Sequence, residues 1–194
     1  MRIMLSPFAA LALLLVALAP AELASGASVF LFWATDSSMS ARSLDQLACE
    51  RAQDAAIRAF ACQEAADEAQ ASARLKSLSK ALDREPSSTI GEPERERDRA
   101  IGALEGGAFD DEYMHERVND LARSLALYED ATREVSDPSI LGYIAEQLPA
   151  LERRYDVARQ VQMRLASTAP LPWGSGRSND HQTTAGPVPS FPGY

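Results

Sequence analysis

Apolar side chains recur at alternating steps of three and four residues along three stretches of this chain. The stretches cover 53–83, 108–135 and 138 to about 166. This spacing places one continuous apolar stripe along an α-helix and is typical of helices that pack lengthwise on their neighbours. We therefore predict three long amphipathic helices. Their stripe positions are, in chain order, Ile57, Ala61, Ala71, Leu75, Leu78 and Leu82; Met114, Val118, Leu121, Leu125 and Tyr128; Leu141, Ile144, Leu148, Leu151, Tyr155, Ala158 and Leu165.

A fourth long helix is predicted before these three, over 30–52. Its sequence contains neither Pro nor Gly, and alanines separate its larger apolar residues, which are Phe30, Trp33, Leu44 and Leu47. Asp54 follows this stretch and can cap the free N–H groups of a new helix. The sequence therefore predicts a sharp turn between two antiparallel helices near Gln53.

The restart of the last helix is marked by the segment SDPSI at 136–140. Asp137 can serve as the N-cap, and Pro138 suits the first helical position because its missing N–H would be unpaired there anyway. Pro149 lies inside the same helix, where it removes a backbone donor, so we expect a kink at that point.

The segment 84–93 breaks the helical pattern with Pro86, Gly91 and Pro93. A short helix is predicted to start at Pro93 or Glu94 and to end at 106–107. A long crossing connection suits a bundle whose second and third helices are not simple hairpin partners. The fold predicted from these patterns is all-α: a four-helix bundle with a short extra helix between its second and third long helices.

Both ends of the chain differ from this central part, and they suggest three regions. Residues 1–27 combine Arg2, a twelve-residue apolar run and a small-residue junction at 25–27. This pattern is typical of a signal peptide that is removed after Ala27, and the run is too short to span a bilayer. An uncleaved anchor is the alternative. We therefore expect residues 28–166 to form the domain, located in the periplasm or secreted, with no membrane span after cleavage.

The C-terminal segment 167–194 is rich in Pro, Gly, Ser and Thr. Such a composition buries too little apolar surface to offset chain entropy, so the segment is predicted to be a disordered tail. Trp173, Phe191 and Tyr194 lie among its prolines. They fit either a recognition motif or a plain flexible tail.

The net charge of the chain is −9, and it stays −9 without residues 1–27 because Arg2 and Glu22 cancel. Nucleic-acid binding rests on Lys and Arg neutralising phosphates, so nucleic acid is not expected as a partner. The densest charge run, at 92–100, alternates in sign and is interpreted as a solvated face.

The only two cysteines, Cys49 and Cys62, flank the predicted turn near Gln53 at unequal distances. We expect them to remain free thiols, because unequal distances from a hairpin turn would separate their Cα atoms too far for a bridge. Only two histidines occur, His115 and His181, so a Cys-His catalytic pair is not expected.

Carboxylates on an apolar stripe need a partner, and the second predicted helix carries two. Glu64 and Glu68 share the stripe of Ile57, Ala61 and Leu75. A buried charge is tolerated only where an opposite charge or several hydrogen bonds meet it. The opposite charge has to come from another helix.

A family resemblance follows from three quoted segments: GGAFDDEY at 106–113, SDPSI at 136–140 and AEQLPALERRYDVAR at 145–159. They resemble the bacterial domain-of-unknown-function family 4142. The resemblance extends back over 44–75 and covers roughly 30–163. It implies a ferritin-like bundle of exported proteins, often catalogued as outer-membrane proteins. The residues matching its motifs are Phe109, Asp110, Tyr113, Asp137, Pro138, Leu148, Pro149 and Leu151.

Three departures from the family pattern matter for function. The family's Asp-His pair on the second helix reads Asp67-Glu68 here, and two further family histidines are replaced by Leu121 and Arg154. Glu68 and Arg154 thus stand where the resemblance places two facing histidines. We predict that they form a polar pair in the core, with Glu64 able to share Arg154.

Ferritin-like bundles can hold two metal ions, which requires inward Glu residues and Glu-x-x-His motifs. Only one Glu-x-x-His occurs in this sequence, at Glu112 and His115, where that arrangement needs two, and we interpret His115 as exposed. The first long helix is expected to place Ala41 and Leu44, and no carboxylate, on its inner face. Asp110 and Asp111 are interpreted as solvated first-turn residues. We therefore expect no bound metal, no cofactor and no catalytic residues.

The sequence predicts a non-enzymatic protein of the cell envelope that serves as a binding or stress-related module. Its partner would be another envelope protein or a small molecule. The alternative is a degenerate ferritin-like metal-binding protein or oxidoreductase that has lost its histidine ligands. A purely structural envelope protein is a third possibility.

Overall fold

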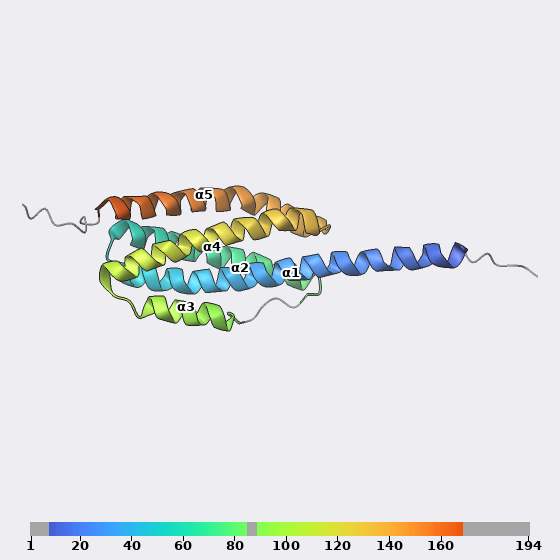
Figure 1. Ribbon diagram of the computed structural model, residues 1–194, viewed down its shortest axis with the longest axis horizontal. Coiled ribbons are helices and arrows are strands. Elements are labelled where there is room, and N and C mark those ends of the chain that lie inside the picture. Colours follow the sequence, from blue (N-terminus) through green and yellow to red (C-terminus); the bar gives the residue numbers. More distant parts are fainter. Residues whose placement is uncertain (1–7, 85–88, 169–194) are drawn as a thin grey trace, which may run out of the picture.

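The computed structural model describes residues 8–84 and 89–168, with side chains from residue 26 onward. Every regular element in these ranges is an α-helix, which confirms the all-α prediction for the described part of the chain. Figure 1 shows the helices in chain order. Their bounds are α1 (Phe8–Arg51), α2 (Ala55–Ala81), α3 (Glu92–Gly102), α4 (Gly106–Glu134) and α5 (Pro138–Thr168).

The four long helices run side by side along one axis (Figure 1). α1 packs against α2 and α4, α4 packs against α5, and α2 touches α5 much less closely. α3 lies along one side, against α1 and α4. α1 begins at Phe8 rather than near residue 30, and its first part extends beyond the bundle (Figure 1). None of the helices in the described ranges has both the length and the apolar character needed to cross a bilayer.

The core is built from the predicted stripes. Ile57 and Leu75 of α2, Leu121 of α4 and Ile144 of α5 are almost fully buried. Phe30 of α1 meets Tyr128 of α4 edge-on, with ring centroids 5.1 Å apart. Burying such side chains contributes about 1.5–3 kcal/mol each, so the lengthwise seams supply most of the driving force for assembly.

The turn between α1 and α2 is fixed by two aspartates. Asp54 caps α2 as predicted, accepting hydrogen bonds from the backbone N–H groups of Ala56 (2.7 Å) and Ile57 (3.1 Å). Asp110 of α4 accepts from the backbone N–H groups of Gln53 (3.0 Å) and Asp54 (2.8 Å). The prediction of a solvated Asp110 is therefore wrong: only 4% of this residue is exposed, because its carboxylate satisfies the free N–H groups of a neighbouring turn.

The cysteines at this turn are also not as predicted. Cys49 and Cys62 form a disulfide, with their Cα atoms 4.7 Å apart. The expectation of free thiols assumed that equal residue counts are needed on the two sides of the turn. Residues 52–54 are not helical, and Asp54 has an extended backbone. An extended residue advances about twice as far as a helical one, so unequal counts bring the two cysteines level.

The connection to the second hairpin contains a shorter helix than predicted. α3 has Pro93 in its first turn, as expected, but ends at Gly102 rather than at 106–107. Gly106 instead opens α4 with a φ of +61°, a left-handed backbone conformation that favours glycine. The chain therefore reverses between α3 and α4 at this residue.

The start of α5 follows the prediction. Asp137 accepts hydrogen bonds from the backbone N–H groups of Ser139 (2.8 Å) and Ile140 (3.2 Å), and Pro138 is the first helical residue. Pro149 lies inside α5, which continues as one helix to Thr168. The first two residues of the predicted tail, 167 and 168, belong to this helix, and the rest of it lies outside the described residues.

Candidate functional site

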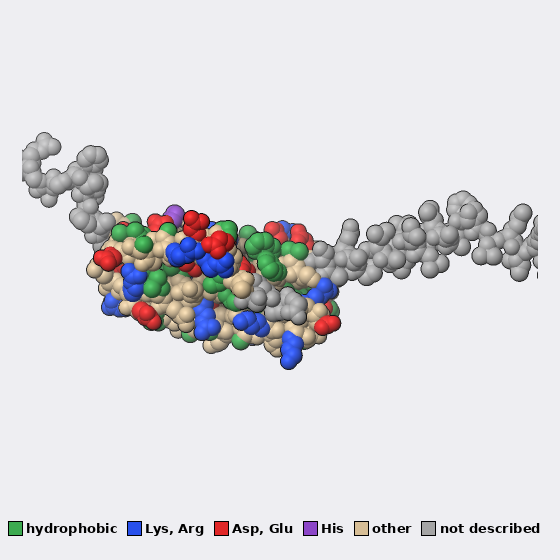
Figure 2. Space-filling view, turned by 90° about the horizontal axis from the view of Figure 1, so that it is seen from below, with side chains coloured by type: hydrophobic (Ala, Val, Ile, Leu, Met, Phe, Trp, Pro, Cys, Tyr) green, Lys and Arg blue, Asp and Glu red, His purple; other side chains and the backbone are tan. Residues whose placement is uncertain are grey.

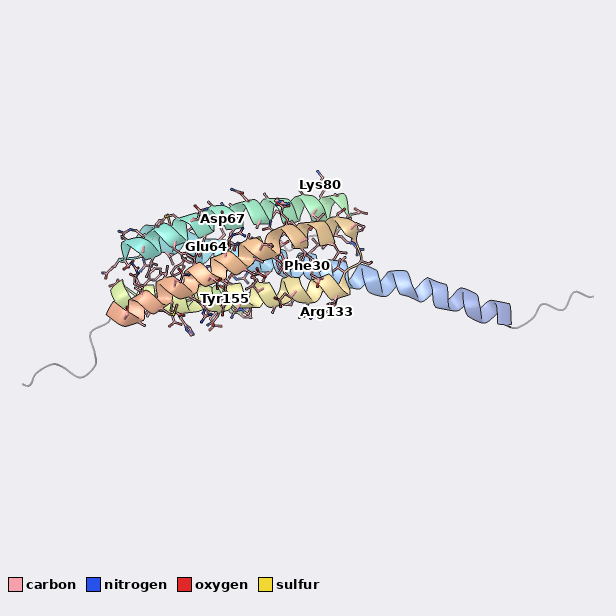
Figure 3. All side chains as sticks on the ribbon, turned by 90° about the horizontal axis from the view of Figure 1, so that it is seen from above. Phe30, Glu64, Asp67, Lys80, Arg133 and Tyr155 are labelled. Atoms are coloured by element: carbon pink, nitrogen blue, oxygen red, sulfur yellow. A yellow bond between two sulfur atoms is a disulfide. The ribbon has the colours of Figure 1, made fainter. Side chains whose placement is uncertain are left out.

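A cluster of charged side chains lies in the middle of the bundle. Each of the four long helices contributes to it: Asp45 from α1, Glu64 and Glu68 from α2, Arg117 from α4 and Arg154 from α5. Figure 3 shows Glu64 on α2, in the space between α2 and α5. We refer to these five residues as the charge cluster.

Arg117 is the centre of the charge cluster, and its side chain is only 1% exposed. Its Nε lies 2.9 Å from Asp45 Oδ1, and its Nη2 donates to Glu64 Oε2 at 2.6 Å. A longer contact of 3.7 Å reaches Glu68. Two neighbouring turns of α4 place Tyr113 and Leu121 on the same buried face, so Arg117 points inward because of its register.

Arg154 holds the two glutamates from the other side. Its Nε donates to both carboxylate oxygens of Glu64, at 3.0 and 3.1 Å. Its Nη2 donates to Glu64 Oε2 at 2.8 Å and also to Glu68 Oε1. The Arg154 side chain is 14% exposed. The structure thus brings together the three residues that the sequence singled out, Glu64, Glu68 and Arg154.

Protonation balances the charges in this cluster. Burial raises the pKa of Asp45 to about 8, although Arg117 and the Tyr113 hydroxyl, which donates to Asp45 Oδ1 at 2.8 Å, act in the opposite direction. For Glu64, burial also disfavours ionisation, but Arg154 and Arg117 outweigh it and lower the pKa. With Asp45 protonated at pH 7, the two glutamates of the charge cluster face its two arginines.

Two members of the charge cluster were missed in the sequence. The prediction that the first long helix has no inward carboxylate is wrong, because Asp45 is fully buried. Asp45 lies between Ala41 and Ala48 at helical spacing, and Arg117 lies between Tyr113 and Leu121 in the same way. A charged residue on a buried face was the available signal. The stripe analysis applied it to the second long helix but not to the other two.

A second charged cluster joins α3 to α4. Arg97 Nε lies 3.0 Å from Glu116 Oε1, and Arg123 Nη2 donates to the same oxygen at 2.6 Å. Asp98 accepts from the Ser40 hydroxyl at 3.4 Å, and burial raises its pKa to about 6. The interpretation of 92–100 as a solvated face is therefore wrong for Arg97 and Asp98, which α3 turns toward α1 and α4.

The remaining motif residues have structural surroundings. Phe109 and Tyr113 stack with ring centroids 6.2 Å apart, and both are buried at the start of α4, where packing was expected. Leu151 is buried in α5, Leu148 is partly buried, and Pro149 is exposed. These residues hold the ends and seams of the helices together.

A groove with a volume of about 610 Å³ opens between α2 and α5, above the charge cluster. Glu64 and Arg154 form part of its floor. One end is bounded by the ion pair of Asp54 and Arg164 (2.8 Å), the other by Arg74 and Glu146 (2.6 Å). The other lining residues are Ala56, Phe60, Gln63, Asp67, Gln70, Ala71, Gln147, Ala150, Arg153, Val157 and Val161.

The arrangement of the charge cluster does not suit a bound metal ion. Guanidinium nitrogens of Arg117 and Arg154 already lie 2.6–3.1 Å from the oxygens of Glu64. A cation placed among these carboxylates would therefore be repelled by two fixed positive charges. Within the described residues, no group of three or more His, Cys, Asp or Glu side chains is arranged to hold a metal ion.

Comparison with known proteins gives one match. The model of the family described as "Domain of unknown function (DUF4142)" matches residues 15–161. No curated protein and no solved structure matches the chain. The matched range includes all five residues of the charge cluster and every lining residue of the groove. The chain belongs to the DUF4142 family.

Proposed function

From this family membership and the site geometry, we propose that the chain is a non-enzymatic binding protein of the bacterial cell envelope. Its ligand, an envelope protein or a small molecule, would occupy the groove between α2 and α5. The groove carries this proposal, because a volume of about 610 Å³ is within the usual range of ligand sites. We also assign the bundle to the ferritin-like class, on the order of its helices and the long connection between α2 and α4.

Export is the second part of the proposal. The signal-peptide pattern at 1–27 supports it, and so does the Cys49–Cys62 disulfide. Structural disulfides persist in oxidising compartments and are rare in the cytosol. The intact mass of the exported protein tests this part. A mass that corresponds to cleavage after Ala27, less two hydrogens for the disulfide, is the expected result, whereas retention of 1–27 would contradict secretion.

The chemistry of the groove favours a ligand that is largely apolar and uncharged. Glu64 and Glu68 are engaged by Arg154 and Arg117, and Arg74 is paired in a bidentate contact with Glu146. An ionic ligand that binds Glu64, Glu68 or Arg74 would have to displace one of these partners. Phe60 and Val157, in contrast, offer apolar surface at one end of the groove.

The neutral dye Nile red is a suitable probe, because its fluorescence rises in apolar sites. We expect the purified protein to bind it, and Val157→Glu to weaken the binding at least fivefold. Val29→Glu is the matched control: Val29 is 48% exposed and Val157 is 46% exposed, but Val29 does not line the groove. Equal effects of the two substitutions would argue against the groove as the binding site.

The alternative function is that of a degenerate ferritin-like metal-binding protein or oxidoreductase. The convergence of Asp45, Glu64 and Glu68 from two helices favours it, while the two bound guanidiniums oppose it. Elemental analysis of dialysed protein separates the two proposals. Stoichiometric iron, manganese or zinc would support the alternative and overturn the non-metal function.

A further inference from the structure

The groove between α2 and α5 is divided along its length into an apolar end and a charged end. At the apolar end lie Ala56 and Phe60 of α2 and Val157 and Val161 of α5. The charged lining residues lie further along, toward the Arg74–Glu146 ion pair. The apolar end is also the end at which α5 finishes, because Arg164 there reaches back to Asp54.

Val157 is the clearest sign that this end lacks a cover. Its side chain is 46% exposed, although Val157 faces a groove rather than a convex surface. Phe60 on the opposite wall is only 8% exposed. An apolar wall of this kind gains free energy when another apolar group covers it, at about 25 cal/mol for each Å² removed from water.

The chain itself continues for 26 residues beyond α5, from 169 to 194. Its first part, APLPWGSG at 169–176, contains no charged residue and places Trp173 five residues after the last residue of α5. Five extended residues reach about 17 Å. Val161 lies seven residues before the end of α5, which is about 10 Å back along the helix axis. Trp173 can therefore reach the apolar end of the groove.

We propose that segment 169–176 folds back along α5 and places Trp173 between Phe60, Val157 and Val161. This inference rests on the proposed function of the groove, and it adds regulation to it. The match of chemistry supports it: a segment without charged residues meets the apolar walls at this end of the groove. Proline-rich segments with an aromatic residue dock in apolar grooves with little loss of chain entropy, since the prolines restrict the free chain.

A tethered segment competes with any outside ligand at a high effective concentration, which is in the millimolar range for short linkers. A ligand of the groove must therefore displace Trp173 or bind beside it. The tail would act as an intramolecular competitor, so that only a ligand with enough affinity to displace it could occupy the apolar end of the groove.

Tryptophan fluorescence of the full-length chain tests the contact directly. The chain has two tryptophans, and Trp33→Phe leaves Trp173 as the only one. In this background we expect a blue-shifted emission maximum and acrylamide quenching at least twofold weaker than that of free N-acetyltryptophanamide. Val157→Glu should return both values to those of the free compound, and the matched control Val29→Glu should change neither.

Three results would overturn the inference. Quenching of Trp173 equal to that of the free compound would show that it stays in water. Protection that survives Val157→Glu would place it elsewhere, and protection that grows with protein concentration would assign the contact to a second copy of the chain. Supporting evidence would be a several-fold gain in Nile red binding on Trp173→Ala.

The Nile red experiment also separates this inference from the proposed function. If Trp173 is exposed but Val157→Glu still abolishes Nile red binding, the groove is a binding site without an internal competitor. If Trp173 is protected and Nile red binding is insensitive to both Val157→Glu and Trp173→Ala, the tail covers the apolar end and the proposed ligand site is wrong.

Discussion

Arg117 offers the sharpest test of the charge cluster, because it is 1% exposed and contacts carboxylates from two other helices. In Arg117→Met the side chain keeps most of its apolar stem and loses the guanidinium. Glu64 and Glu68 are then left with Arg154 as the only positive partner, so that one buried negative charge lacks compensation. Breaking a buried pair in this way typically costs about 3–5 kcal/mol.

This loss is large compared with the about 5–15 kcal/mol that usually holds a domain together. Arg123→Met is the matched control: Arg123 lies on the same helix and contacts Glu116 and Asp120, but its side chain is 56% exposed. Exposed ion pairs contribute about 0–1 kcal/mol. We therefore expect the two substitutions to differ by at least 2 kcal/mol.

The assay is equilibrium unfolding in urea, followed by circular dichroism. A shift of the midpoint without a change of slope reports a change in stability alone. Two further measurements identify the cause as electrostatic. Glu64→Gln added to Arg117→Met should restore part of the loss, because it removes a stranded charge. The deficit should also shrink from pH 7 to pH 5, where the unpaired carboxylate takes up a proton more readily.

The reasoning fails if Arg117→Met and Arg123→Met destabilise the protein equally. It also fails if the deficit of Arg117→Met neither responds to Glu64→Gln nor decreases at low pH. Either result would mean that Arg117 stabilises the bundle through the packing of its stem and not through its charge.

Three other predictions follow from the same contacts. Double replacement of Cys49 and Cys62 by Ser should lower the unfolding free energy by about 3 kcal/mol, because the disulfide no longer restricts the unfolded chain to a closed loop. Reduction of the disulfide should have the same effect, and a urea titration measures both. Burial raises the pKa of Asp45 to about 8, so its bound proton stabilises the folded state fully below about pH 4, and this stabilisation is lost as the pH rises to 8. The unfolding free energy should therefore fall between pH 4 and pH 8, and Asp45→Asn should remove this dependence on pH. An unchanged dependence in Asp45→Asn would contradict the assignment. A double-mutant cycle on Glu68→Gln and Arg154→Met should show a coupling energy of at least 1 kcal/mol, and strictly additive losses would reject the pairing.

The helices could be read from the sequence because local signals agreed with the tertiary packing. The caps Asp54 and Asp137 and the helix-starting Pro138 act within three residues of their positions. Stripes of apolar residues need no knowledge of the partner helix to predict burial. Two helix ends were predicted wrongly: the start of α1 at Phe8 and the end of α3 at Gly102. At neither position was a capping residue recognised in the sequence.

The candidate site was only partly predictable, for a physical reason. Glu64, Glu68 and Arg154 could be connected because the family resemblance placed them at facing positions. Asp45 and Arg117 pair across α1 and α4, and nothing local in the sequence links the two. The spacing of Asp45 from Ala41 and of Arg117 from Tyr113 can indicate that each lies on a buried face, but not which residue it contacts there.

The disulfide was missed because its geometry depends on three non-helical residues at the turn. Axial distance, not residue count, decides which positions of two antiparallel helices meet. The extended backbone of Asp54 adds axial distance that a count of residues does not include. Asp110 was misassigned for a related reason, since the N–H groups that it binds belong to this same turn.

The electrostatics of the charge cluster also determine what the groove above it can select. On the face seen from below, on the side of α3, acidic and basic side chains are interspersed, so no field of a single sign covers that face (Figure 2). In the groove, an anion competes with Glu64 and Glu68 for Arg154, and a cation meets two guanidiniums beneath the carboxylates. Either ion must break a pair that is partly or fully desolvated, which is unfavourable by several kcal/mol. The floor therefore disfavours both kinds of ion, and we expect the apolar walls around Val157 to supply most of the affinity. Binding in this groove should accordingly depend only weakly on salt, because the forces that select the ligand are apolar contacts rather than exposed charges.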